Sequence, residues 1–270
     1  MLLRTTLAAL TLSSSLLLAQ SPTPTPPRPK FDTFEVATIK PTDPDTRGRY
    51  IIMQGNNRFI EKSYTLKLLI AAAYDLNPRT ISGGPSWIDS EHYDIVAVTP
   101  GELRPTHDEQ MSMLRTLLTD RFKLTFHREP KTFSIYEIEM AKPGKPGPKL
   151  KESTAPPTDP HTVGPGVVYP QRIVLPGRNA TIADFASLLQ RAILDRPVVD
   201  KTGLTARYDF DLEWAPDETQ FGGDVPTPSA DTPASPLFTA IQEQLGLRLV
   251  ATRGPVDALI IDKAERPSAN

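Results

Sequence analysis

The sequence contains no cysteine at all. This absence excludes disulfide bonds, zinc–thiolate sites, iron–sulfur clusters and thiol nucleophiles, and it also excludes a lipid anchor attached through cysteine. A chain of 270 residues can nevertheless be stable without disulfides, because it is long enough to bury a sizeable apolar core. Any functional site must therefore be built from the remaining polar side chains.

Long apolar runs are also missing, apart from one near the N-terminus. Residues Leu7–Leu18 are apolar or small, interrupted only by threonine and serine hydroxyls, and they fall short of the roughly 20 residues of a spanning helix. Arg4 precedes this run and Ala19 follows it, which is the order of a secretory signal peptide. We expect residues 1–19 to be removed during export, with an uncleaved N-terminal anchor as the alternative. The mature chain is then periplasmic or secreted and has no membrane span.

The chain has no excess of positive charge. Lysine and arginine number 30 against 32 aspartate and glutamate, a formal net charge of −2. Nucleic-acid-binding domains usually show a basic face, so we do not expect nucleic acid as a partner.

Proline, in contrast, is abundant, with 29 residues gathered in clusters. The cluster at 20–33 predicts an extended linker, because proline lacks the N–H that helices and sheets need. A second cluster predicts a long connection over 143–178. These two segments divide the body into a first α+β unit at 34–142 and a second at 179–270.

The two units carry matching segments. TLKLLIAAAYD (65–75) matches TIADFASLLQR (181–191), and YDIVAVTP (93–100) matches YDFDLEWAP (208–216). The apolar spacing predicts the order strand, helix, strand, helix, strand, strand in each unit. We therefore predict an α+β fold of two tandem βαβ-type repeat units, each a small sheet with two helices. The alternative is that any two α+β stretches look alike at this level.

Motifs for catalysis or metal binding are scarce. His92, His107, His127 and His161 do not fall at metal-ligand spacing. His107 belongs to His107-Asp108-Glu109, which we interpret as a helix start, where acids complement the helix dipole. The triplet Lys201-Thr202-Gly203 is interpreted as a turn, because no serine has the lysine three residues later that penicillin-binding enzymes require.

Three acids and two tryptophans also have structural interpretations. Asp209, Asp211 and Glu213 alternate with apolar residues and are interpreted as the solvent-facing side of a strand, although paired carboxylates can serve glycosidases. Trp87 and Trp214 are interpreted as core residues. The sequence thus assigns no catalytic, cofactor-binding or metal-binding residue and implies no cofactor.

Several longer stretches resemble a known family. The C-terminal stretch 198–217 followed by 235–270, together with FEVATIKP (34–41), 83–97 and 113–153, is similar to a secreted, soil-associated bacterial protein family with a domain of unknown function. Ala206 departs from the glycine usual there. The resemblance covers nearly the whole mature chain and carries no functional residues over, because the family has no established activity.

The resemblance also implies a cellular context. Similar domains occur fused to membrane metallopeptidases of the β-lactam-sensor type. Each predicted unit is more weakly similar to the short N-terminal domain of secretins and TonB-dependent receptors, a module of protein–protein contact. Both similarities imply sensing or partner binding outside the cytoplasm by analogy.

The first functional hypothesis is therefore an extracytoplasmic, non-catalytic interaction or sensor module, whose partner is an envelope protein or a small ligand. Whether the chain is an enzyme stays open, and the scarcity of catalytic motifs favours a protein that is not an enzyme. The alternative is a secreted hydrolase in which His92, Asp94, Asp209 and Asp211 meet in a cleft between the units. A purely structural envelope protein is the third hypothesis.

Overall fold

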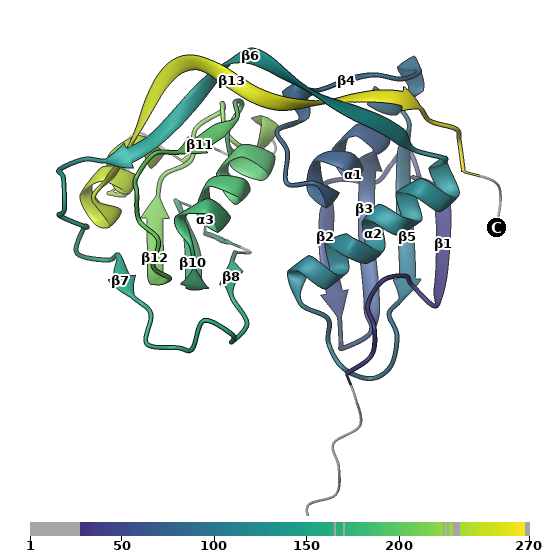
Figure 1. Cartoon of the computed structure of the whole chain (residues 1–270), viewed down its shortest axis with the longest axis horizontal. Coiled ribbons are helices and arrows are strands. Elements are labelled where there is room, and N and C mark those ends of the chain that lie inside the picture. Colours follow the sequence, from purple (N-terminus) through teal and green to yellow (C-terminus); the bar gives the residue numbers. More distant parts are fainter. Residues whose placement is uncertain are drawn as a thin grey trace, which may run out of the picture.

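A computed structural model describes residues 28–164, 166–169, 171–223, 225, 227–228 and 233–267. The predicted signal peptide 1–19 and the beginning of the predicted linker, residues 20–27, lie outside the described residues. Figure 1 shows two lobes that hang side by side from a long two-stranded arch. In the described ranges no helix is long and apolar enough to cross a membrane.

The first lobe is an antiparallel four-stranded sheet with helices on one face. The strand order is β1-β5-β3-β2, so that β1 and β2 are the edges. Two short 3-10 turns, η1 and η2, follow α1. The elements are β1 (Val36–Pro41), β2 (Tyr50–Gln54), β3 (Arg58–Thr65), α1 (Leu66–Ala73), η1 (Pro78–Thr80), η2 (Ser86–Asp89), β5 (His92–Val98) and α2 (His107–Phe122).

The second lobe has a sheet of the order β7-β12-β10-β8, and β9 pairs with β10 as well. Helices α3 and α4 each continue into a π-helical turn, η3 and η5. Much of this sheet comes from residues 143–178, the predicted connection. The elements are β7 (Lys151–Glu152), β8 (Thr162–Val163), β9 (Val167–Tyr169), β10 (Arg172–Ala180), α3 (Ile182–Leu188), η3 (Leu189–Ile193), β12 (Tyr208–Trp214), η4 (Phe221–Gly223), α4 (Leu237–Ala240) and η5 (Ile241–Leu245).

The arch interlocks the two halves of the chain. Strands β6 (Thr125–Met140) and β13 (Leu247–Lys263) pair antiparallel along their whole length. Strand β6 starts in the first lobe and ends in the second, whereas β13 starts in the second lobe and ends in the first. The short strand β11 (Val198–Asp200) pairs in parallel with the end of β6, and β4 (Ile81–Gly83) pairs in parallel with the end of β13. As a result β13 contributes to the core of the first lobe, and β6 to that of the second.

The predicted fold class was wrong. The described residues hold thirteen strands in three sheets, and of the four α-helices only α2 is longer than eight residues. The last two strands predicted for each unit are one continuous strand in the structure, β6 through Pro130 and β13 through Pro255. Both prolines lie where the arch is only two strands wide, because β4 and β11 pair with its ends. The nitrogen of each proline, which carries no hydrogen, can therefore face the side of the arch without a neighbouring strand, so that no ladder hydrogen bond is lost.

Two hydrophobic cores, one in each lobe, hold the helices against the sheets. Leu66, Leu69 and Ile70 of α1 are buried, as the 3.6-residue spacing predicts. Trp87 and Trp214 belong to the first and second core, with 8% and 0% of their surface exposed, which confirms their interpretation as core residues.

Candidate functional site

Asp94 on β5 is the most heavily hydrogen-bonded of the acids that the sequence offered for hydrolysis. Its carboxylate accepts hydrogen bonds from the Thr42 hydroxyl (2.8 Å) and the Ser63 backbone N–H (3.1 Å), and it forms an ion pair with Lys62. Burial alone would raise the pKa of Asp94. The hydrogen bonds from Lys62, Thr42 and Ser63 outweigh burial and hold this pKa below its ordinary value.

His92 lies next to this network. Its Nδ1 is 3.0 Å from the Ser63 carbonyl oxygen and 3.2 Å from the Ser63 hydroxyl. A carbonyl oxygen only accepts hydrogen bonds, so we assign the proton of the neutral ring to Nδ1 and leave Nε2 as an acceptor. His92 and Asp94 therefore share Ser63 as a neighbour, and Ser63 fixes the orientation of both.

Asp209 and Asp211 lie on β12 in the other lobe. Asp209 accepts a hydrogen bond from the Asn179 backbone N–H at 2.7 Å, and Asp211 forms an exposed ion pair with Arg178 at 2.8 Å. The four residues of the hydrolase hypothesis are thus divided between two sheets, and each carboxylate already accepts a hydrogen bond. The structure does not bring them together in one cleft.

The aspartate of the Tyr-Asp pair that the two matched segments share stabilises a β-bulge in each lobe. Strand β3 shifts register between Glu61 and Tyr64, and β10 shifts between Gly177 and Ala180. A non-glycine residue with positive φ lies inside each bulge, Ser63 in the first lobe and Asn179 in the second. The Ser63 N–H donates a hydrogen bond to Asp94, and the Asn179 N–H donates one to Asp209. These two acids therefore support strained backbone.

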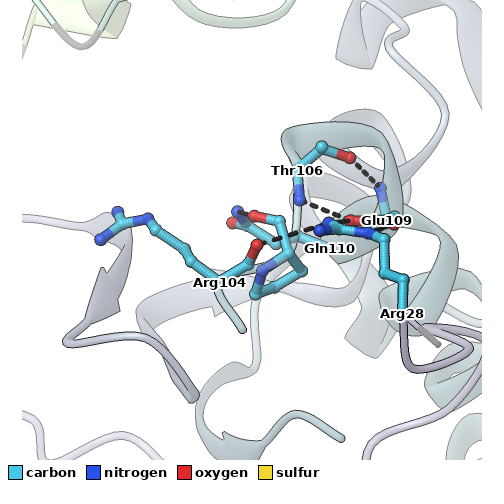
Figure 2. Close-up of polar contacts among 6 residues, drawn as sticks. Arg28, Arg104, Thr106, Glu109 and Gln110 are labelled. Carbon is cyan, nitrogen blue, oxygen red and sulfur yellow. Dashed lines mark hydrogen bonds and ion pairs between the residues drawn. The ribbon is translucent and has the colours of Figure 1, made fainter. Parts of the chain in front are cut away.

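The start of α2 confirms the interpretation of His107-Asp108-Glu109 as a helix start. Figure 2 shows the capping box, in which Glu109 N–H donates to the Thr106 hydroxyl at 3.3 Å and Thr106 N–H donates to the Glu109 carboxylate at 2.7 Å. Arg28, near the end of the predicted linker, donates to both Glu109 carboxylate oxygens at 3.1 and 2.6 Å. Arg28 holds the pKa of Glu109 below its usual value.

The remaining sequence candidates are distributed over the molecule. Thr202 donates to Asp200 from its N–H and its hydroxyl, at 2.8 and 2.7 Å, which confirms the turn. His127 lies exposed on the arch between Asp262 and Glu129. Burial lowers the pKa of His107. The described part of the chain contains no group of three or more His, Asp or Glu side chains that could hold a metal ion.

One open hollow of about 460 Å³ lies on the first lobe, a volume within the range of small-molecule sites. Ile39, Tyr93 and His92 line it, and the Glu91–Arg266 ion pair borders it. Arg266 donates three hydrogen bonds to the two carboxylate oxygens of Glu91 and lies 5.3 Å above the Trp87 ring. The charges of this pair neutralise each other, so the hollow offers a mostly apolar surface without a net charge.

Exposed apolar side chains gather on the edges of the sheets. Of the eight large apolar residues that are exposed in the described ranges, six lie on edge strands. They are Val36 on β1, Tyr50 and Ile52 on β2, and Val167, Val168 and Tyr169 on β9.

The sequence does not show that these six side chains are exposed. A signal was nevertheless present in YIIMQ at 50–54, because a β-prone run between glycines 48 and 55 is typical of a short strand. Its position at a sheet edge depends on the tertiary fold, and sequence periodicity does not reveal it.

One comparison with known proteins finds a match. The model of a family described as "Protein of unknown function (DUF3738)" matches residues 67–264. No curated protein and no solved structure matches the chain.

Proposed function

Because the chain belongs to the DUF3738 family of unknown function, we propose its function from geometry: it is a non-catalytic interaction module that acts outside the cytoplasm. It captures an extended segment of an envelope protein by adding that segment to one of its sheet edges. The resemblance to domains fused to β-lactam-sensor metallopeptidases supports a role in signal reception. The predicted signal peptide 1–19 supports the location, which N-terminal sequencing of the exported protein would check.

The observation that carries this proposal is the apolar character of the sheet edges. An edge strand presents unpaired backbone N–H and C=O groups, and soluble proteins usually protect such edges with charged side chains, proline or very short strands. Here β2 presents Tyr50 and Ile52 to solvent, and the three-residue strand β9 presents Val167, Val168 and Tyr169. Main-chain pairing with an extended partner segment, together with apolar contacts, is a common mode of peptide recognition.

No observation favours the hydrolase alternative. His92 and Asp94 lie in the first lobe, whereas Asp209 and Asp211 lie in the second. A small ligand could occupy the hollow beside Arg266. However, Glu91 and Arg266 bind each other, so neither charge is available to bind a charged group of such a ligand.

Site-directed photo-crosslinking tests the interaction. A photoreactive amino acid replaces Ile52, Val168 or the exposed control Glu102, one position at a time, in cells that naturally produce the protein. We expect one discrete adduct with an envelope protein from an edge position and none from Glu102. Adducts of equal yield from all three positions, or from none, would contradict the proposal.

We also propose that the two lobes descend from one duplicated unit. Each lobe has a bulge followed by a threonine-capped helix, Thr65 for α1 and Thr181 for α3. Each lobe also gives its last long strand to the other. This proposal concerns origin and leaves the binding proposal independent of it.

A further inference from the structure

We propose that β2 is the strand that receives the partner, and that the partner segment is an extended strand of consecutive apolar residues flanked by acidic residues. This inference rests on the proposed function, since it names the site and the chemistry of the partner. Three features of β2 support it: an unpaired side, apolar side chains on both faces, and arginines at both ends.

The first feature is the unpaired side of β2. Within the described ranges β2 pairs only with β3, from Tyr50 opposite Lys62 to Gln54 opposite Arg58. In Figure 1 it is the strand of its sheet nearest the second lobe. Its other side therefore offers backbone donors and acceptors over five residues, which is the usual length of a strand.

The second feature is that both faces of β2 are apolar. Tyr50 and Ile52 project on one face and are 44% and 45% exposed. Ile51 and Met53 project on the opposite face and pack against the first-lobe core. A strand added beside β2 would place its successive side chains next to apolar neighbours on either face, so apolar residues at consecutive positions fit it best.

The third feature is positive charge at both ends. Arg47 is exposed three residues before β2. Arg58 and Arg104 lie at the other end, and Arg104 Nη1 donates to the Gly55 carbonyl at 3.1 Å. No carboxylate of the described residues forms an ion pair with Arg47, Arg58 or Arg104. Acidic residues at both ends of a bound strand would complement these guanidinium groups.

The other apolar edge lacks this charge pattern. Strand β9 has only three residues. The arginine beside it, Arg172, lies 5.0 Å above the Tyr169 ring and forms an ion pair with Glu213 at 3.5 Å. Of the two edges, β2 is therefore the longer one and the one with cations available for a partner.

A peptide probe tests this inference on the mature protein. The probe is a fluorescein-labelled, end-blocked peptide Asp-Glu-Val-Ile-Tyr-Val-Glu-Asp, and the matched control replaces its four acids by lysine. We expect the acidic peptide to bind at least about tenfold more tightly, with affinity falling as salt screens the arginines. Equal affinity for the two peptides, or no binding up to millimolar concentration, overturns the inference.

Protein variants locate the site. Ile52→Lys should weaken binding at least about tenfold, because a charged side chain blocks an edge, whereas Val168→Lys should leave binding unchanged. Arg47→Glu combined with Arg58→Glu should reverse the preference in favour of the lysine peptide. Circular dichroism and the midpoint of thermal unfolding confirm that each variant is folded.

Three outcomes distinguish this inference from the proposed function. Crosslinks from Val168 without crosslinks from Ile52 overturn β2 as the site and leave edge capture standing. Self-association that Ile52→Lys abolishes identifies a second copy of the chain as the occupant and overturns the acidic partner. Peptide binding through β2 without any envelope adduct supports the chemistry of the site and contradicts the proposed partner.

Discussion

The two lobes stabilise equivalent β-bulges with the same kind of hydrogen bond, but they fill the space beside each bulge with different side chains. In both, a strand bulges just before a helix, and an aspartate of the adjacent strand receives the N–H of the residue with positive φ. That pair is Ser63 with Asp94 in the first lobe and Asn179 with Asp209 in the second. The similarity identifies the acids as supports of the bulge.

The difference lies at the first residue of each bulge. Glu61 occupies this position in the first lobe and Gly177 occupies it in the second, opposite Ile95 and Phe210 respectively. A Cβ on Gly177 would lie 2.3 Å from the Phe210 ring, so the ring fills the space above the glycine. In the first lobe a carboxylic acid is buried in the core instead. The same backbone thus accommodates either an aromatic ring or a buried acid.

The largest effect is expected from Glu61, which is 0% exposed. One of its oxygens accepts the Tyr64 N–H at 2.9 Å, and the other has no partner among the described residues. Burial, reinforced by the charge of Asp94, raises the pKa of Glu61 from 4.5 to about 9. Between these values the folded protein keeps a proton that the unfolded chain releases, so stability falls as pH rises.

Urea unfolding of the wild type and of Glu61→Gln across this window measures the effect. The amide keeps an acceptor for Tyr64 but does not titrate, so we expect the variant to gain up to about 5 kcal/mol relative to the wild type between pH 5 and pH 9. Glu102→Gln, on the exposed surface, is the control and should leave the pH slope unchanged. Parallel pH profiles for wild type and Glu61→Gln would show that Glu61 is ionised in the folded protein.

Gly177→Ala should have the next largest effect, because the methyl group collides with Phe210. Overpacking of this kind costs about 2–3 kcal/mol in the free energy of unfolding. Phe210→Leu shortens the ring that collides, so the double variant should lose less than the sum of the two single losses. If the losses of the two single variants simply add, the methyl group does not contact Phe210. The proposed difference in packing between Gly177 and Glu61 would then be wrong.

Asp209→Ala should cost about 2 kcal/mol, because the Asn179 N–H loses a charged acceptor. Asp94→Ala should cost more, since Thr42 and Lys62 lose the same carboxylate. The asparagine variants keep an acceptor oxygen and should lose less in both lobes. A larger loss for Asp209→Ala than for Asp94→Ala would contradict the hydrogen-bond networks described above.

Local features of the fold could be predicted from the sequence, and pairing between distant segments could not. The N-caps Thr65 and Thr181 and the apolar stripe of α1 follow from interactions within a few residues. Strands β6 and β13 are far apart in the sequence. A proline lies in the middle of each and interrupts the strand pattern, and periodicity does not specify which strand pairs with which.

The candidate site illustrates the same limit. In RFIEK (58–62), Glu61 shares a strand face with Phe59, yet a carboxylate next to Lys62 is expected at the surface, and only the fold makes it a buried residue. Tyr50 and Ile52 show the reverse case, since a β-prone run leads one to expect burial. Their exposure follows from the sheet ending at β2.

The smallest effect is expected where the lobes meet. Asp75 and Arg191 are the last residues of the two matched segments, and they form an ion pair of 3.2 Å between the lobes. If the two matched segments were identical, these two equivalent positions would carry the same charge and would repel each other. Asp75→Arg or Arg191→Asp alone should lower the free energy of unfolding by about 1 kcal/mol, because the Asp75 side chain is 40% exposed and solvent screens its charge.

The double reversal, Asp75→Arg with Arg191→Asp, should regain most of this loss in urea unfolding, since opposite charges then meet again. The lobes are also joined by amides, because Gln190 donates to the Asp75 carbonyl at 2.6 Å and Asn77 donates to the Gln190 carbonyl at 2.7 Å. If the double variant stays as unstable as the single ones, these amide contacts fix the junction and the charges do not. Recovery would instead show that opposite charge at equivalent positions lets two similar halves face each other within one chain.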